Sequence, residues 1–280
     1  MTSLPAILRA WTFPPVSVIG VLLLAGGYAR GTQLVRRNSG HSYPRRKRAC
    51  FFAGVVVLAL CLLSPIDTYS DLLLSVHMAQ HLLMTMVVAP LLLLGGPVTL
   101  ALQSASPEVR RRYLLPTLHS RIIKTLTNPV VAWCAFAVVM WGSHFTPLYE
   151  RALENQSVHA AEHLLYLGSA LLFWLPVVGI DPTPSRLSHP SRILYLFLAM
   201  PQTTFLGLAI YGSDRVLYPH YLVATARLGV SPLADQHLAG ALMWVSAMVL
   251  LLPALAWVLL EWMDREEREG ERADRRLAPT

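Results

Sequence analysis

Residues 72–94 read LLLSVHMAQHLLMTMVVAPLLLL and contain no Asp, Glu, Lys or Arg. A helix of about 20 mostly apolar residues is long enough to cross the hydrocarbon core of a bilayer. Two histidines, His77 and His81, interrupt the apolar run near its start. The stretch therefore predicts a membrane-spanning helix that carries imidazole groups near one end.

The composition of the whole chain is that of a membrane protein. Of its 280 residues, 54% are hydrophobic and 14% are charged. Soluble domains carry about 25% charged residues, and disordered chains have low hydrophobicity. These values argue against both classes. The formal net charge is +7, and in so apolar a chain we expect this charge in loops that flank the membrane, with no nucleic-acid partner.

Seven apolar segments are candidates to span a bilayer: residues 15–35, 50–66, 72–94, 130–144, 158–180, 193–211 and 237–262. The predicted fold class is all-α, a polytopic membrane helix bundle with seven transmembrane helices. We expect a seven-span membrane domain over residues 1–263 and a charged cytoplasmic tail over residues 264–280. No cleaved signal peptide is expected ahead of the first segment.

Basic residues are concentrated in alternate loops between these segments. One loop contains the basic run 45–48, and another contains three arginines at 110–112. Cytoplasmic loops carry an excess of Lys and Arg, so the N-terminus is predicted outside and the C-terminus inside. Residues 108–126 are predicted to form an interfacial helix on the inner face.

Two histidine pairs share the same spacing and the same predicted depth. His77 and His81 are four residues apart near the start of the third segment, and His159 and His163 repeat this spacing in the fifth. Side chains four apart lie on one helix face about 6 Å apart, so both can reach one metal ion. Polar groups at membrane depth usually face a bundle interior. The spacing indicates a metal site at the outer ends of spans three and five, with helix packing as the alternative for each pair.

Other side chains with ligand atoms fall at the same predicted depth. Glu162 precedes His163, His144 ends the fourth segment, and Asp235 lies at the start of the seventh. Met78 follows His77, and a thioether selects Cu(I), whereas imidazole suits Zn, Cu, Fe and Ni. We therefore include Glu162, His144, Asp235 and Met78 among the candidate metal ligands, with packing and capping roles as the alternatives.

The same residues carry a resemblance to a known family. The motifs are HMAQHLLM at 77–84, APLL at 89–92, GGP at 95–97, WGSH at 141–144, HAAEH at 159–163 and DQHLAGALMW at 235–244. Over spans two to seven, the chain resembles the CtaG-type assembly factors of caa3-type cytochrome c oxidase. The resemblance implies a seven-span protein that is needed to assemble the oxidase and is linked to copper delivery.

The resemblance leads to a specific functional expectation. We expect an assembly factor of the bacterial inner (plasma) membrane, not an enzyme, that handles copper at a histidine cluster facing the outer side. Its expected partners are cytochrome c oxidase subunits or copper chaperones, together with the lipid bilayer. The expected metal ligands are His77, His81, His159, His163, His144, Met78, Glu162 and Asp235.

Residues 159–163 also match the H-x-x-E-H pattern of zinc hydrolases, in which the Glu acts as general base beside two His ligands. An intramembrane zinc-dependent hydrolase that uses Glu162 is therefore the alternative, with a third ligand from His77 or His81. A carrier of one haem held between the two helices, and a purely structural scaffold for oxidase subunits, are further alternatives.

Overall fold

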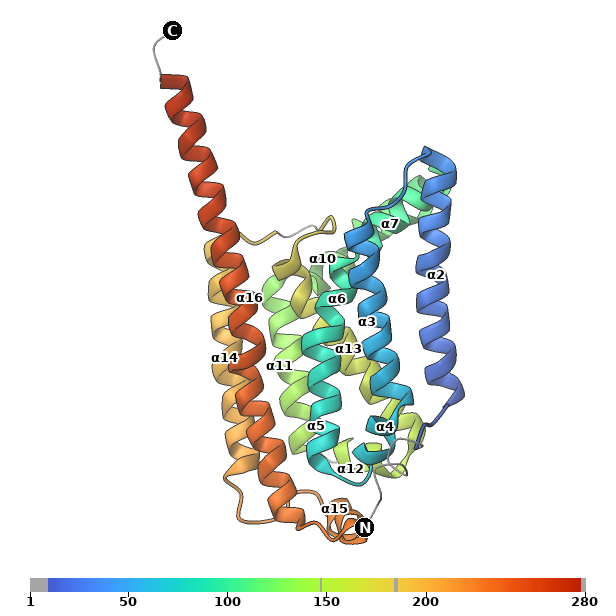
Figure 1. Cartoon of the computed structure of the whole chain (residues 1–280), viewed down its shortest axis with the longest axis vertical. Coiled ribbons are helices and arrows are strands. Elements are labelled where there is room, and N and C mark those ends of the chain that lie inside the picture. The colour runs from blue at the N-terminus through green and yellow to red at the C-terminus, as the bar shows by residue number, and fades with distance from the viewer. Residues whose placement is uncertain (1–9, 147, 184–185, 278–280) are drawn as a thin grey trace.

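The computed structural model describes residues 10–146, 148–183 and 186–277, and every regular element within these ranges is helical. This confirms the predicted all-α class. Figure 1 shows the long helices side by side in one bundle. They are α2 (Pro15–Ser39), α3 (Arg45–Leu63), α5 (Leu74–Leu83) continued by η1 (Met84–Val88) and α6 (Ala89–Leu94), α11 (Pro129–Phe145), α13 (Gln156–Val178), α14 (His189–Tyr211) and α16 (Pro232–Leu277).

Five helical stretches in the described residues are long and apolar enough to cross a membrane. They are Pro15–Ser39, Leu74–Ser104, Gln156–Val178, His189–Tyr211 and Pro232–Arg272. The chain is therefore a membrane protein. The other two predicted spans fall on α3, which begins with four basic residues, and on α11, an apolar helix of 17 residues. Seven crossings and the sidedness of the termini stay predictions.

The second predicted segment, 50–66, does not end where the hydropathy suggested. Helix α3 stops at Leu63, and a separate short helix, α4 (Pro65–Ser70), begins directly after it. Ser64 has extended backbone between the two, and its hydroxyl accepts a hydrogen bond from the Ile66 N–H at 3.2 Å. A serine cap followed by proline at the first helical position is a strong start signal for a new helix.

The third span contains a π-helical turn that fastens it to α13. Pro90 has no N–H to donate, and the preceding Ala89 N–H bonds to the carbonyl of Met84 instead of that of Thr85. The carbonyl of Thr85 accepts the indole N–H of Trp174 at 2.8 Å. In a membrane, a backbone group released from the helix ladder must find a partner within the protein. The π turn therefore sets the position of α13 against the third span.

Helices α14 and α16 lie side by side along the bundle (Figure 1). Their backbones approach closely at Gly207 and Gly240. A Cβ atom on Gly240 would lie 2.5 Å from the backbone nitrogen of Tyr211, and one on Gly207 would lie 2.7 Å from that of Trp244. Small residues permit such contacts between membrane helices, where van der Waals packing drives association.

Short helices cover the two ends of the bundle. Helices α4, α12 (Leu148–Glu154) and α15 (His220–Ala224) lie at one end, and α7 (Pro97–Ser104) and α10 (Arg121–Leu126) lie at the other, from which α16 projects (Figure 1). The predicted interfacial helix 108–126 is several helical pieces. Pro116 lies within it, and the Ser120 hydroxyl caps a new start by accepting the Ile123 N–H at 3.3 Å.

Candidate metal centre

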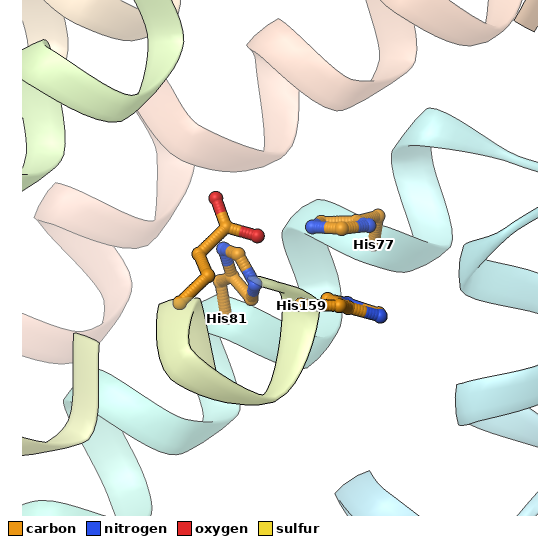
Figure 2. A group of neighbouring side chains, drawn as sticks. His77, His81 and His159 are labelled. Atoms are coloured by element: carbon orange, nitrogen blue, oxygen red, sulfur yellow. The ribbon is translucent and has the colours of Figure 1, made fainter. Parts of the chain in front are cut away.

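Helices α5 and α13 bring four side chains together near one end of the bundle. These are His77 and His81 from α5, and His159 and Glu162 from α13. One ligand atom from each lies within 4.8 Å of those of the other three. We call this group the His/Glu centre. Figure 2 shows its three histidines clustered where the two helices approach.

The four imidazole rings of the two pairs form a two-by-two block. Ring centroids are 4.4 Å apart between His77 and His81, and 4.3 Å apart between His159 and His163. Across the helices, His77 faces His159 and His81 faces His163, each at 5.4 Å. The structure thus brings both predicted pairs together, because the i, i+4 spacing aligns each pair along one helix face. His163 is a neighbour of the His/Glu centre.

The ligand atoms of this block are buried without hydrogen-bond partners among the described residues. They are Nε2 of His77, His159 and His163, both ring nitrogens of His81, and both carboxylate oxygens of Glu162. Leaving a buried polar group unsatisfied costs about 1–3 kcal/mol, and more for a charged one. A cation satisfies several such groups at once. A set of imidazole nitrogens and a carboxylate therefore fits a transition-metal ion such as copper or zinc.

Tyr221 on α15 fixes which nitrogen of His77 can bind a metal. Its hydroxyl donates a hydrogen bond to the carbonyl of Ser70 at 2.8 Å, and its oxygen lies 3.4 Å from Nδ1 of His77. Because the hydroxyl proton is already donated, the oxygen accepts the Nδ1–H. The remaining lone pair of the ring is then on Nε2, the unpartnered atom of the His/Glu centre. Metal-binding histidines are commonly oriented in this way by an outer partner.

Sequence reasoning gave Tyr221 no part in a metal site. Its contact to His77 joins positions 144 residues apart. No local pattern reports such a contact.

His144 and Met78 lie next to the His/Glu centre but outside it. His144 Nε2 is 3.4 Å from Met78 Sδ. Both line a cavity of about 10 Å³ that His81 also lines. The structure therefore brings these two predicted ligands to each other, and His81 both belongs to the His/Glu centre and lines their cavity.

The structure places Asp235 at the start of α5, outside the His/Glu centre. Its carboxylate accepts the Leu74 N–H at 2.6 Å, the Ser75 N–H at 3.4 Å and the Ser75 hydroxyl. Leu73, at the cap position of α5, supplies no side-chain cap of its own. These contacts make Asp235 a cap for the helix that carries His77 and His81. Its predicted role as a metal ligand finds no support in this arrangement.

Two further carboxylates lie near the same end of the bundle. Asp67 on α4 accepts hydrogen bonds from Thr12 at 3.0 Å and from the side chain of Gln80 at 3.2 Å. Burial raises the pKa of Asp67, and these hydrogen bonds partly oppose the rise. Burial also raises the pKa of Asp71, and the charge of His159 opposes it. Both acids contribute to the potential around the histidine block.

The bundle, its apolar span-length helices and the buried histidine block define a polytopic helical membrane protein with a candidate metal centre between two helices. The profile of the cytochrome c oxidase caa3 assembly factor family, Caa3_CtaG, matches residues 26–265. The chain belongs to this family. The resemblance read from the motifs is thus confirmed, and the matched range includes all the candidate ligands.

Curated relatives come from mycobacteria. Uncharacterized proteins of Mycobacterium bovis and Mycobacterium tuberculosis are each 32% identical to the chain over 276 residues, and one of Mycobacterium leprae is 29% identical over 277 residues. Each alignment covers 96% of this chain and 42% of the relative. The chain therefore spans less than half the length of these relatives. No solved structure matches it significantly.

Proposed function

We propose that this protein is a plasma-membrane assembly factor that binds copper at the His/Glu centre and supplies it to cytochrome c oxidase. The observation that carries the proposal is the set of unpartnered ligand atoms of His77, His81, His159 and Glu162, gathered within 4.8 Å. Family membership supplies the oxidase as the destination. His163 completes the histidine block. Its ring can replace one of the four ligands on the ion while copper is being released. Oxidase subunits or copper chaperones are the proposed partners.

The surroundings of the His/Glu centre favour metal handling over hydrolysis. A hydrolase that used Glu162 as general base would need space for a substrate beside the metal. The cavity next to His81 measures about 10 Å³, which is about the room for one water molecule. The larger cavity of about 680 Å³ is lined by apolar residues such as Tyr28, Leu92 and Leu171, and by no residue of the centre. Glu162 also lies within the ligand group, where it can bind the metal itself.

The distribution of charges supports an outer location for the His/Glu centre. The basic segments 45–48 and 110–112 belong to the end of the bundle where α7 and α10 lie, opposite α4 and α12. Positive loops remain in the cytoplasm. We therefore place the centre at the outer side of the membrane, within seven crossings.

Metal analysis of the whole chain, purified in detergent, tests the proposal. We expect copper in the wild-type protein and loss of the copper held at the His/Glu centre in the His77→Ala/His159→Ala double variant. His220→Ala is the matched control, because its Nε2 contacts the carbonyl of Asp71 at 2.9 Å, outside the His/Glu centre. Equal copper content in wild type and double variant would overturn the proposal. Zinc retained in place of copper would favour the hydrolase.

A cellular assay adds the functional arm. In a bacterial strain that lacks its own copy of the gene, we expect cytochrome c oxidase activity to be restored by the wild-type chain and by His220→Ala. The double variant should reach the membrane in normal amount without restoring that activity. Full restoration by the double variant would contradict copper supply through this centre.

A further inference from the structure

We infer that His144 and Met78 form a second binding site, specific for a soft monovalent cation, beside the His/Glu centre. We call it the His/Met site. Its occupant would be copper(I), so the inference rests on the proposed function and adds a second copper site to it. Met140 and Met243 line the same cavity. All four side chains are buried, with exposed fractions of 5% or less.

The histidine and the three methionines that line this cavity come from three helices. Met78 comes from α5, Met140 and His144 from α11, and Met243 from α16. A methionine in a membrane bundle is often only packing material. The hydrogen bonds of the His144 ring give a separate reason to assign a ligand role here.

His144 Nδ1 lies 2.6 Å from the carbonyl oxygen of Met140. A carbonyl oxygen can only accept, so Nδ1 must carry the hydrogen and donate it. The hydroxyls of Ser143 and Tyr166 also lie near Nδ1, at 3.1 and 3.3 Å, and they do not alter this assignment. In a neutral imidazole the lone pair is then on Nε2.

That lone pair faces another acceptor. The Sδ atom of Met78 is 3.4 Å from Nε2 and has lone pairs but no hydrogen to donate. A buried nitrogen and a buried sulfur therefore oppose each other without a hydrogen bond between them. The separation suits two ligands of one ion, because metal–nitrogen and metal–sulfur bonds of about 2.0 and 2.3 Å give this spacing at a near-tetrahedral angle.

The donor chemistry selects the ion. Imidazole and thioether are both neutral, and thioether ligands select Cu(I). Neutral ligands leave the full charge of a divalent ion uncompensated in an apolar interior, whereas a monovalent ion costs far less to bury. The His/Glu centre differs because Glu162 supplies a negative charge. The two sites thus prefer ions of different charge.

His81 connects the two sites. It belongs to the His/Glu centre and lines the cavity of the His/Met site. A copper(I) ion can pass from one to the other by exchanging ligands at His81. The ion keeps its oxidation state, so the step needs no electron donor. His77, His159 and the Glu162 carboxylate leave the ion, and His144 Nε2 and Met78 Sδ bind it in their place while His81 stays bound. The His/Met site lets the protein retain copper(I) while the outer centre is emptied.

The test counts copper(I) bound by the full-length chain in detergent under anaerobic conditions. We expect two equivalents in wild type and loss of one in Met78→Leu, which keeps the volume and removes the sulfur. Met84→Leu is the matched control, since Met84 is equally buried but belongs to the other core cluster, which includes Phe51 and Val88. X-ray absorption at the copper edge should show a sulfur neighbour in wild type and in Met84→Leu. Unchanged stoichiometry together with unchanged sulfur scattering in Met78→Leu overturns the inference.

Two further variants separate this inference from the proposed function. His77→Ala/His159→Ala should lose one equivalent and keep the sulfur neighbour. If the double variant keeps both equivalents, the proposal that copper binds at the His/Glu centre is wrong. The His/Met site is tested separately, by the result for Met78→Leu. Should Met78→Leu fail to fold, His144→Leu with silver(I) as the probe replaces it, because it removes the other proposed ligand. Thermal stabilisation by silver(I) that is smaller than in wild type supports the site, and equal stabilisation contradicts it.

Discussion

Asp235→Ala is predicted to destabilise the bundle strongly, because Asp235 caps α5 from another helix. In the wild type its carboxylate accepts the Leu74 N–H at 2.6 Å and the hydroxyl of Ser75. Alanine removes both acceptors and leaves both donors buried, since Leu74 and Ser75 are 2% and 6% exposed. Water cannot easily replace the carboxylate at this position.

The size of the effect follows from these contacts. A hydrogen bond to a charged group contributes about 1.5–3 kcal/mol, so two give about 3–6 kcal/mol as an upper range. Loss of an ordinary N-cap costs about 1 kcal/mol and at most about 2. Because the donors here are buried, we expect a loss of about 3 kcal/mol in the free energy of unfolding. Asp235→Asn keeps one acceptor oxygen and should lose about 1 kcal/mol, because Asn caps helices nearly as well as Asp.

Unfolding by sodium dodecyl sulfate in mixed micelles, followed by tryptophan fluorescence, measures these differences. Asp214→Ala serves as control, because Asp214 is exposed at the same end of the bundle. The capping argument fails if Asp235→Ala matches this control within about 0.5 kcal/mol, the usual range for surface substitutions. A stable Asp235→Asn protein that has lost its copper would instead make Asp235 a ligand.

Three further substitutions test other parts of the bundle, two by the same unfolding measurement and one by thermal unfolding at several pH values. Gly240→Val should lose at least about 1–3 kcal/mol of unfolding free energy, since its side chain would collide with the backbone of α14. Gly142→Ala is the control and should retain full stability, because a Cβ atom at Gly142 would have no neighbouring atom within 4 Å. Trp174→Phe should cost about 1–3 kcal/mol because the carbonyl of Thr85 loses its donor; no loss would mean that this carbonyl finds another partner. Burial raises the pKa of Asp67 above 3.8, so the stability it contributes is complete below 3.8 and declines as the pH rises through the raised value. Asp67→Asn should therefore gain in melting temperature relative to wild type between pH 4 and pH 7, and a constant difference would contradict the shift.

Hydropathy alone located the helices because each segment that crosses a bilayer must by itself be long and apolar enough to do so. The fifth segment, predicted at 158–180, is observed as Gln156–Val178, and the sixth, predicted at 193–211, ends at the predicted Tyr211. Errors arose where polar or proline signals divide an apolar run. Ser64 starts a new helix inside the second segment, and the π turn at Met84–Val88 interrupts the third.

The histidine block was predictable for a related reason. The spacing of His77 to His81 and of His159 to His163 depends only on helical periodicity, which membrane helices keep with few exceptions. The same periodicity places Glu162 three residues from His159, on the same face. The sequence could not show whether the faces of α5 and α13 meet, because that depends on the rotation of each helix in the bundle.

That rotation is set by polar contacts whose partners are far apart in the chain. Asp235 of α16 holds the first turn of α5, and Gln80 donates to the carbonyl of Cys61 on α3 at 2.7 Å. Trp174 of α13 holds the π turn that follows. The two proposed ligand positions of α5, His77 and His81, lie between the first and last of these anchors. In a membrane, where apolar surfaces discriminate poorly between packing partners, such hydrogen bonds determine the relative rotation of helices. Loss of an anchor would therefore turn His77 and His81 away from α13, and at the proposed metal centre this should lower the affinity for the ion.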